Sequence, residues 1–158
     1  MNAHADLIQR FYAAFARKDA EEMVACYAPD VRFSDPVFPD LVGERAKGMW
    51  RMLVSRGKDL RLEFSGIEAD ERTGKAHWEA WYTFSATGRK VHNVIDATFT
   101  FRDGLIATHT DSFDLYRWSR MALGPKGTLL GWTPFVQRAI RRQADAALTR
   151  YLADRGPR

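Results

Sequence analysis

The alternation of apolar and polar residues in the second half of the chain constrains the fold more than any other feature. Residues 60–64 alternate strictly, and residues 75–85 continue the pattern with one apolar face formed by Trp78, Ala80, Tyr82 and Phe84. Period-two alternation is typical of a strand with one buried face. Short glycine-containing turns follow at 87–88 and 103–104. The sequence therefore predicts a short strand at 60–64 and an antiparallel meander of three long strands at 75–85, 91–101 and 105–116.

Helical periodicity replaces this alternation earlier in the chain. Residues 3–17 place Leu7, Phe11 and Phe15 on one stripe, which predicts an amphipathic helix. A capping box at Asp19 predicts a second helix over 20–27, and a third is expected over 45–55, with a short strand at 31–34 between them. Helices that precede an antiparallel meander indicate an α+β fold, in which a curved antiparallel sheet wraps around the N-terminal helices.

Residues 117–158 differ from the rest of the chain in charge, with nine Lys or Arg residues and two acidic ones. Such a segment can bind nucleic acid or an anionic membrane, but the solvated face of a helix explains it more simply. We therefore expect no nucleic acid and no membrane as partners.

The same segment has its own predicted elements. Helices are expected over 117–123 and from Thr133-Pro134 onward, with a loop at 126–127. The run LLGWTPF, residues 129–135, is too apolar for a free linker, and the apolar stripe of the last helix must be buried against another element. We therefore expect residues 117–152 to close the cavity mouth or to brace the sheet. The chain is thus divided into a domain of residues 1–116 and a C-terminal helical extension of residues 117–158.

Composition excludes several classes of protein. A hydrophobic fraction of 46% is ample for a core, and no apolar run approaches the roughly 18 residues that span a membrane. The N-terminal residues lack the basic and apolar regions of a signal peptide, so a cytoplasmic protein is expected. One cysteine, Cys26, and the absence of metal-ligand spacings predict no disulfide, no metal site and no cofactor.

One acid, Asp35, lies in an otherwise apolar stretch, VRFSDPVFPD, residues 31–40. An Asp-Pro pair commonly starts a turn, which is one interpretation. The other is a general base, because apolar surroundings disfavour the charged carboxylate and raise its pKa toward neutrality. These ten residues leave both interpretations open.

The order helix, helix, short strand ending in Asp-Pro, helix and meander resembles the nuclear transport factor 2-like superfamily over residues 3–116. The segment QRFYAAFARKDAEEMVACYAPDVRFSDP is similar to the ketosteroid isomerase segment that carries an oxyanion-binding tyrosine and the general base. SnoaL-like polyketide cyclases are equally similar. The resemblance implies a cone-shaped α+β barrel whose open end holds an apolar ligand. It also implies that Asp35 is the general base and that Phe11 replaces the tyrosine, so that this donor is missing.

Two residues are candidates for the missing donor. Tyr12 follows Phe11 but points about 100° away around the helix. Asp96 matches the second oxyanion donor of the isomerases. It alternates with Thr98 and Thr100, however, so we expect it on the outer face of the sheet unless a bulge turns it inward.

The last strand carries a second candidate pair. His109, Asp111 and Phe113 share one face and, by the resemblance, match positions that line the isomerase pocket. A His and an Asp two residues apart on a strand have Cβ atoms about 6–7 Å apart, close enough for a hydrogen bond, direct or through one water. An exposed pair on an edge strand is the alternative. The candidate catalytic residues are therefore Asp35, His109 and Asp111.

On this interpretation aromatic side chains line the pocket: Phe11, Phe15, Phe33, Trp50, Trp78, Tyr82, Phe84, Phe99 and Phe113. The expected function is cofactor-free acid–base chemistry, as an isomerase, dehydratase or cyclase, on a small apolar molecule of cyclic or polyketide-like structure. The alternatives are a non-catalytic ligand-binding module and a dimeric assembly module. A homodimer is expected through the outer face of the sheet, because Trp81 stands there among polar residues, namely Glu79, Thr83, Asp96, Thr98, Thr100 and Thr110.

Overall fold

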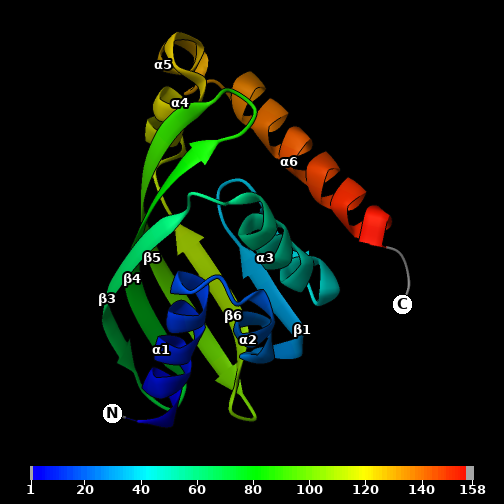
Figure 1. Ribbon diagram of the computed structural model, residues 1–158. Helices are drawn as coiled ribbons and strands as arrows, with labels where there is room; N and C mark the ends of the chain where they lie inside the picture. Colours follow the sequence, from blue (N-terminus) through cyan, green and yellow to red (C-terminus); the bar gives the residue numbers. More distant parts are fainter. Residues whose placement is uncertain (1, 156–158) are drawn as a thin grey trace.

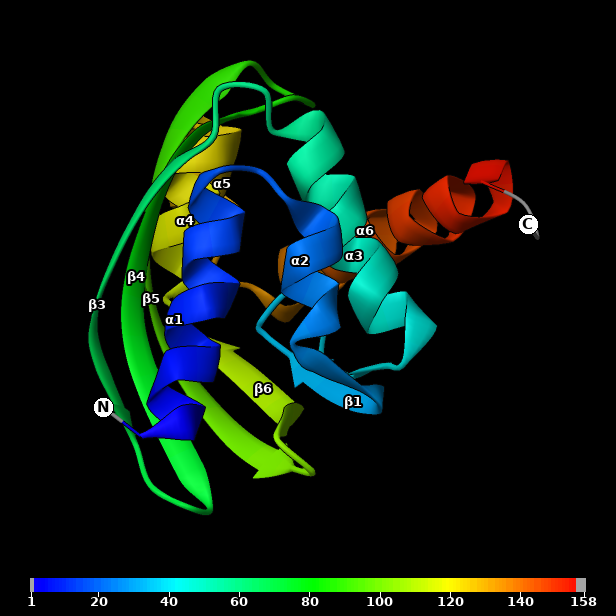
Figure 2. The ribbon, with the colours of Figure 1, turned by 60° about the horizontal axis from the view of Figure 1, so that its bottom comes forward.

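The computed structural model describes residues 2–155 and has an α+β fold (Figure 1). Its elements in chain order are α1 (Ala3–Ala16), α2 (Ala20–Ala25), β1 (Tyr27–Ser34), β2 (Leu41–Val42), α3 (Glu44–Arg56), β3 (Arg61–Ala69), β4 (Thr73–Phe84), β5 (Arg89–Arg102), β6 (Leu105–Ser112), α4 (Leu115–Leu123), α5 (Pro125–Leu130) and α6 (Pro134–Arg155). Figures 1 and 2 show one strongly curved sheet with α1, α2 and α3 on its concave side. The sheet does not close into a barrel, since β2 and β3 form its two edges.

The strand order is β2-β1-β6-β5-β4-β3. The predicted meander is confirmed, because β4, β5 and β6 are consecutive antiparallel neighbours. Its last strand is shorter than the predicted 105–116, since β6 ends at Ser112 and Asp114 caps a helix that begins at Leu115. The predicted fold class is confirmed, with one strand pair that departs from the antiparallel arrangement: β1 pairs parallel with β6, which makes the sheet mixed. No hairpin joins these two strands. The chain crosses from one to the other through α3 and the meander, so no turn sets the direction of β1.

The first strand begins at Tyr27, four residues before its predicted start. The second helix ends at Ala25, two residues before its predicted end, and the Ile106 N–H donates to the Cys26 carbonyl (2.9 Å). The register with β6 shifts between Tyr27 and Arg32, a stretch in which Pro29 has no N–H to donate. This irregular start brings Tyr27 next to β6.

Aromatic side chains fill much of the concave interior. Phe11 and Phe15 from α1 pack against Trp50 from α3, with ring centroids 5.5 and 5.2 Å apart. Phe33 from β1 contacts the same indole at 5.3 Å. All four are buried. Full burial of a large apolar side chain stabilises a fold by roughly 1.5–3 kcal/mol, so this cluster anchors the helices to the sheet.

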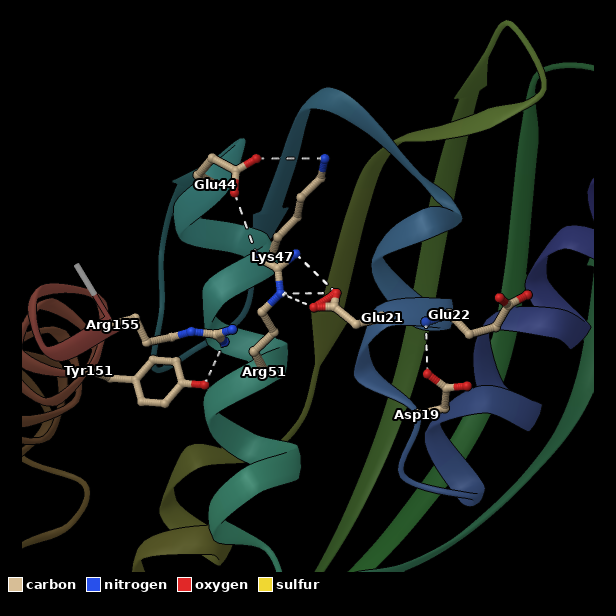
Figure 3. Close-up of polar contacts among 8 residues, drawn as sticks. All are labelled: Asp19, Glu21, Glu22, Glu44, Lys47, Arg51, Tyr151 and Arg155. Carbon is tan, nitrogen blue, oxygen red and sulfur yellow. Dashed lines mark hydrogen bonds and ion pairs between the residues drawn. The ribbon is translucent and has the colours of Figure 1, made fainter. Parts of the chain in front are cut away.

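Ion pairs connect α3 to α2 on the solvent side of these helices (Figure 3). Arg51 Nε lies 2.9 Å from Glu21 Oε1, and Arg51 Nη1 lies 3.6 Å from Glu44 Oε2. Asp19 caps α2 by accepting a hydrogen bond from the Glu22 N–H (3.0 Å). Exposed pairs of this kind add less than about 1 kcal/mol each, so packing and not charge holds the helices in place.

The C-terminal extension braces the sheet through α4, as expected. Trp118 Nε1 donates to the Tyr82 hydroxyl (2.7 Å), and the indole packs in a second apolar cluster with Val91. The last helix, α6, lies along α3 (Figures 1 and 2), where a Cβ at Gly48 would overlap the Leu152 side chain. None of the helices in residues 2–155 combines the length and the apolar character that a membrane span needs.

One prediction about this extension is wrong. The loop expected at 126–127 belongs to α5, because Gly127 lets that short helix pack directly on α4. A Cβ there would overlap the Ser119 carbonyl oxygen. The run at 129–135 forms a hydrogen-bonded turn between α5 and α6, in line with the expectation that it is not a free linker, but four of its side chains are exposed to solvent: Leu129, Leu130, Trp132 and Phe135.

Candidate active site

Asp35 follows the end of β1 and starts the turn that its Asp-Pro sequence predicts. Its Oδ1 accepts hydrogen bonds from the backbone N–H groups of Val37 (2.7 Å) and Phe38 (2.6 Å). Its own N–H donates to the Phe38 carbonyl (2.8 Å). An aspartate that binds the backbone two and three residues ahead forms an Asx turn. The turn interpretation therefore describes how Asp35 is held.

The surroundings of the same carboxyl raise its pKa, as expected for a general base. Burial raises the pKa of Asp35 to about 7, the charge of Asp111 adds to the rise, and the Phe38 and Val37 N–H groups oppose it. Its Oδ2 forms no hydrogen bond within residues 2–155, and the only fully buried side-chain N or O atom without a partner there is the Tyr12 hydroxyl. Oδ2 of Asp35 is therefore not fully enclosed. The turn fixes one oxygen and leaves the other free.

His109 and Asp111 lie on β6 with both side chains buried in the interior. His109 Nε2 is 2.8 Å from Asp111 Oδ1, and Trp78 Nε1 donates to the same oxygen at 3.4 Å. The alternative of an exposed pair on an edge strand is therefore wrong. Asp111 Oδ2 has no partner in the described chain and, like Asp35 Oδ2, is not fully enclosed.

A hydrogen-bonded relay extends from this pair to β1 and α3. Trp50 Nε1 donates to the Tyr27 hydroxyl (2.7 Å), which lies 2.7 Å from His109 Nδ1. Because the indole can only donate, the hydroxyl hydrogen is available to His109 Nδ1, which accepts it. In this arrangement the Nε2–H of His109 donates to Asp111. Both nitrogens of His109 are occupied, so this residue orients Asp111 and has no free atom for a ligand.

The role of Tyr27 is not evident from the sequence. The helical pattern places it in the core, and nothing nearby indicates a partner 82 residues away. The parallel pairing of β1 with β6, in which Phe33 lies opposite His109, creates the contact. In the sequence, only the combination of an inward-facing tyrosine with a histidine on a buried strand face points to a hydrogen bond between the two.

The nine aromatic residues expected to line the pocket fall into two groups. Six are buried and pack into the core: Phe11, Phe15, Phe33, Trp50, Trp78 and Phe99. The other three are half-buried: Tyr82, Phe84 and Phe113. The structure thus fills the deep part of the cone with rings, and an aromatic-lined pocket stays a prediction for its outer part.

That outer part is the junction between the two apolar clusters. Val37, Tyr82 and Phe113 each pack against both clusters. Burial raises the pKa of Tyr82 to about 12, and the charge of Asp35 adds to this rise. Asp35 therefore lies within electrostatic range of both Tyr82 and Asp111, which places the candidate site at this junction.

The candidate oxyanion donors have different surroundings. Asp96 lies on the outer face as expected, in unbroken register with His77 and Ser112, and its Oδ1 is 2.9 Å from His77 Nδ1. Tyr12 is buried, with its ring 5.6 Å from Phe64 and 6.0 Å from Trp78. Burial raises the pKa of Tyr12 well above its usual value, with a further contribution from the charge of Asp111.

A surface pocket of about 300 Å³ borders the Asp35 turn. It is lined by residues 37–41 and by Arg141 and Arg142 of α6. Arg141 Nε also donates to the Pro36 carbonyl (2.9 Å), so the last helix holds the turn. Within residues 2–155, no cluster of three His, Cys, Asp or Glu side chains is arranged to bind a metal ion.

Comparison with known proteins places this site in a family. A model of the SnoaL-like domain matches residues 8–109, which include Asp35 and His109 and end two residues before Asp111. No curated protein is similar enough to this chain to count as a relative.

Several solved structures share the fold. An NTF2-like protein of unknown function from Burkholderia pseudomallei has a TM-score of 0.66 and 20% identity, covering 77% of this chain and 98% of its own. A proposed polyketide cyclase from Xanthomonas campestris has a TM-score of 0.63 and 24% identity, with 75% and 96% covered. An LEH-like epoxide hydrolase from M. tuberculosis has a TM-score of 0.61 and 19% identity, with 80% and 92% covered. Because the family model spans more than half of the sequence, the chain belongs to the SnoaL-like domain family, with the nuclear transport factor 2-like fold.

Proposed function

We propose that this protein is a cofactor-free acid–base enzyme, an isomerase, dehydratase or cyclase, for a small apolar molecule of cyclic or polyketide-like structure. The observation that carries the proposal is the Asp35 carboxyl, with its pKa raised to about 7 and its Oδ2 free. A general base is most effective when its pKa lies near the working pH. Structural neighbours that include a proposed polyketide cyclase and an epoxide hydrolase support this class of chemistry.

The turn prepares Asp35 for proton transfer. Two backbone N–H groups fix Oδ1, so the carboxylate plane cannot rotate freely and Oδ2 keeps one direction. A proton taken from an acidic C–H of the substrate onto Oδ2 would neutralise a charge that burial disfavours. The same proton can then be returned to another atom of the substrate, which is how one carboxyl serves as base and then as acid.

Asp111 is the second carboxyl of the proposed site. His109 and Trp78 donate to its Oδ1 and leave Oδ2 for a polar group of the substrate or a bound water. In this scheme Asp111 contacts the ligand, whereas His109 and Tyr27 are positioning residues. This assignment revises the expectation that His109 itself exchanges a proton with the substrate.

The junction between the two apolar clusters restricts the shape and polarity of the substrate. Val37, Tyr82 and Phe113 offer apolar and aromatic surface beside the two carboxyls, which suits a flat or cyclic molecule with one or two polar atoms. Phe11 supplies no oxyanion donor at the position of the isomerase tyrosine. Its lack of a donor favours dehydration or cyclisation over steroid isomerisation.

The test is hydrogen–deuterium exchange of a carbon acid. A panel of cyclic ketones would be incubated with the protein in D₂O, and loss of the α-proton signals followed by proton NMR. We expect the wild type to accelerate exchange for at least one ketone and Asp35→Asn to abolish it. Asp40→Asn is the matched control, because Asp40 is exposed on the same loop and pairs with Arg32 (2.8 Å).

Equal exchange by the wild type and Asp35→Asn would overturn the role of Asp35. The second candidate function is a non-catalytic ligand-binding module, which the occupied nitrogens of His109 favour, since the imidazole has no free atom for proton exchange with a ligand. It predicts saturable binding of a ketone, seen as ligand line broadening, without exchange in any variant.

The outer face of the sheet supports a homodimer as the second part of the proposal. Trp81 is half-buried there, stacked on His92 with ring centroids 4.5 Å apart and covered by the Arg61 guanidinium at 4.2 Å. This flat stack of rings is a surface that a second copy of the chain can cover.

A further inference from the structure

Four large apolar side chains project into solvent where α5 joins α6, at the upper end of the molecule in Figure 1. These residues, here called the apolar tip, are Leu129 (71% exposed), Leu130 (47%), Trp132 (64%) and Phe135 (70%). In the rest of the described chain only Val42 and Leu53 are large apolar residues with comparable exposure. Such a concentration in seven residues usually marks a contact surface.

The apolar tip is held outward by an ordered frame. The Gly131 N–H donates to the Gly127 carbonyl (2.8 Å), and the Thr133 N–H donates to the Leu130 carbonyl (2.9 Å). Trp132 Nε1 donates to the Leu129 carbonyl (3.0 Å), so the indole needs no further polar partner. The exposed side chains therefore belong to a fixed turn between two helices and not to a loose tail.

The segment of chain that carries the apolar tip is basic. Residues 115–144 contain six Lys or Arg residues and no Asp or Glu. Lys126 lies one turn before Leu129 and Leu130 on α5, and Arg138 and Arg142 continue the stripe of Phe135 along α6. These three basic side chains are exposed, and none forms an ion pair with a residue of the described chain.

We propose that the apolar tip docks on an anionic lipid bilayer. Leucine, tryptophan and phenylalanine side chains beside unpaired basic residues are the composition that binds at the boundary of head groups and acyl chains. Nucleic acid would engage the basic residues but leave the apolar ones in water. A second copy placed tip to tip would bring the unpaired charges of both copies together. This proposal reverses the expectation of no membrane partner, which took the basic residues of the extension to be only the solvated face of a helix.

The test is sedimentation with vesicles of an equimolar mixture of phosphatidylcholine and phosphatidylserine. We expect the full chain to sediment with these vesicles, at least tenfold less with phosphatidylcholine alone, and less as salt is raised. The double variant Trp132→Ser/Phe135→Ser and the double variant Arg138→Gln/Arg142→Gln should each lose most of the binding. Val42→Ser and Arg72→Gln are matched controls, because both residues are exposed elsewhere and should bind like the wild type.

Two results would overturn the proposal. One is a wild type that does not sediment with the anionic vesicles. The other is binding that the serine double variant retains in full, which would leave only a general attraction of basic protein to anionic lipid. If light scattering shows that the serine double variant lowers the mass of the protein while vesicle binding is absent, a second copy covers the apolar tip. Circular dichroism of each variant serves as the folding control. We expect every variant to be folded, because all of the substituted side chains are exposed.

Discussion

Asp35 shows how one side chain satisfies two physical demands at once. Its Oδ1 is an ordinary turn acceptor, which any Asp-Pro sequence predicts, and its pKa is raised because the turn packs into an apolar junction. The sequence predicts both properties separately, since VRFSDPVFPD contains both the turn dipeptide and the apolar neighbours. What it cannot predict is that the turn binds Oδ1 and leaves Oδ2 without a partner, because this depends on backbone geometry.

Asp35→Asn should be more stable than the wild type at pH 8, by on the order of 2 kcal/mol. Asparagine keeps the acceptor for Val37 and Phe38 but carries no charge. A carboxyl whose pKa is raised on folding destabilises the folded state as it ionises, so the wild type loses stability between about pH 4 and pH 7. Urea unfolding over this range measures the effect. Asp40→Asn should show no comparable pH dependence, and a pH-independent gain in Asp35→Asn would contradict the raised pKa.

Tyr27→Phe should destabilise the fold by about 1–3 kcal/mol, because it leaves Trp50 Nε1 and His109 Nδ1 buried without a partner. Chemical denaturation of the two proteins measures the loss. Tyr116→Phe is the matched control, since that hydroxyl bonds the Thr128 carbonyl near the surface (2.8 Å) and should cost less. Equal losses would mean that the relay adds nothing specific.

At the scale of elements, local patterns identify the meander and the N-terminal helices but not the contacts between distant segments. Period-two alternation fixes β4, β5 and β6 because each strand has one buried face. The start of β1 and the helix α5 could not be predicted, because their local sequences do not indicate the structure that they adopt. Ala-Pro-Asp and Gly-Pro-Lys-Gly are typical of loops, and tertiary packing on β6 and on α4 overrides that preference.

Arg141→Gln should loosen the Asp35 turn, because it removes the hydrogen bond from α6 to the Pro36 carbonyl. We expect faster amide hydrogen exchange at Asp35 and Phe38, whose backbone groups close the turn, while amides in the β4–β5 pair exchange at the wild-type rate. Arg142→Gln, which removes an exposed charge from the same helix, serves as the control. Unchanged exchange at both amides in Arg141→Gln would show that the turn is stable without α6.

At the scale of the whole molecule, the curved open sheet separates two surfaces, for each of which we propose a different partner. The concave side holds the candidate site and is covered by helices, whereas the outer face presents the Trp81 stack and the pair formed by His77 with Asp96. The apolar tip lies on neither face. A ligand, a second copy and a lipid surface can therefore be bound without competing for the same residues.

Trp81→Ser should convert a homodimer into a monomer, because it removes the ring at the centre of the outer-face stack. Static light scattering at micromolar concentration measures the mass. Trp132→Ser is the matched control, since it removes an equally large ring from the apolar tip and should leave the mass unchanged. A wild type that is monomeric under these conditions would contradict a dimer through the sheet.

The bond between Tyr27 and His109 also has a consequence for the order of folding. It joins residues 82 positions apart through a parallel strand pair, so the chain must close a long loop before the bond can form. The hairpins of β4, β5 and β6 close short loops and are expected to form earlier. The relay that orients Asp111 is then completed only when β1 docks, after the meander exists. In refolding experiments, protection of the Tyr27 and His109 side chains should lag behind the far-ultraviolet signal of the sheet.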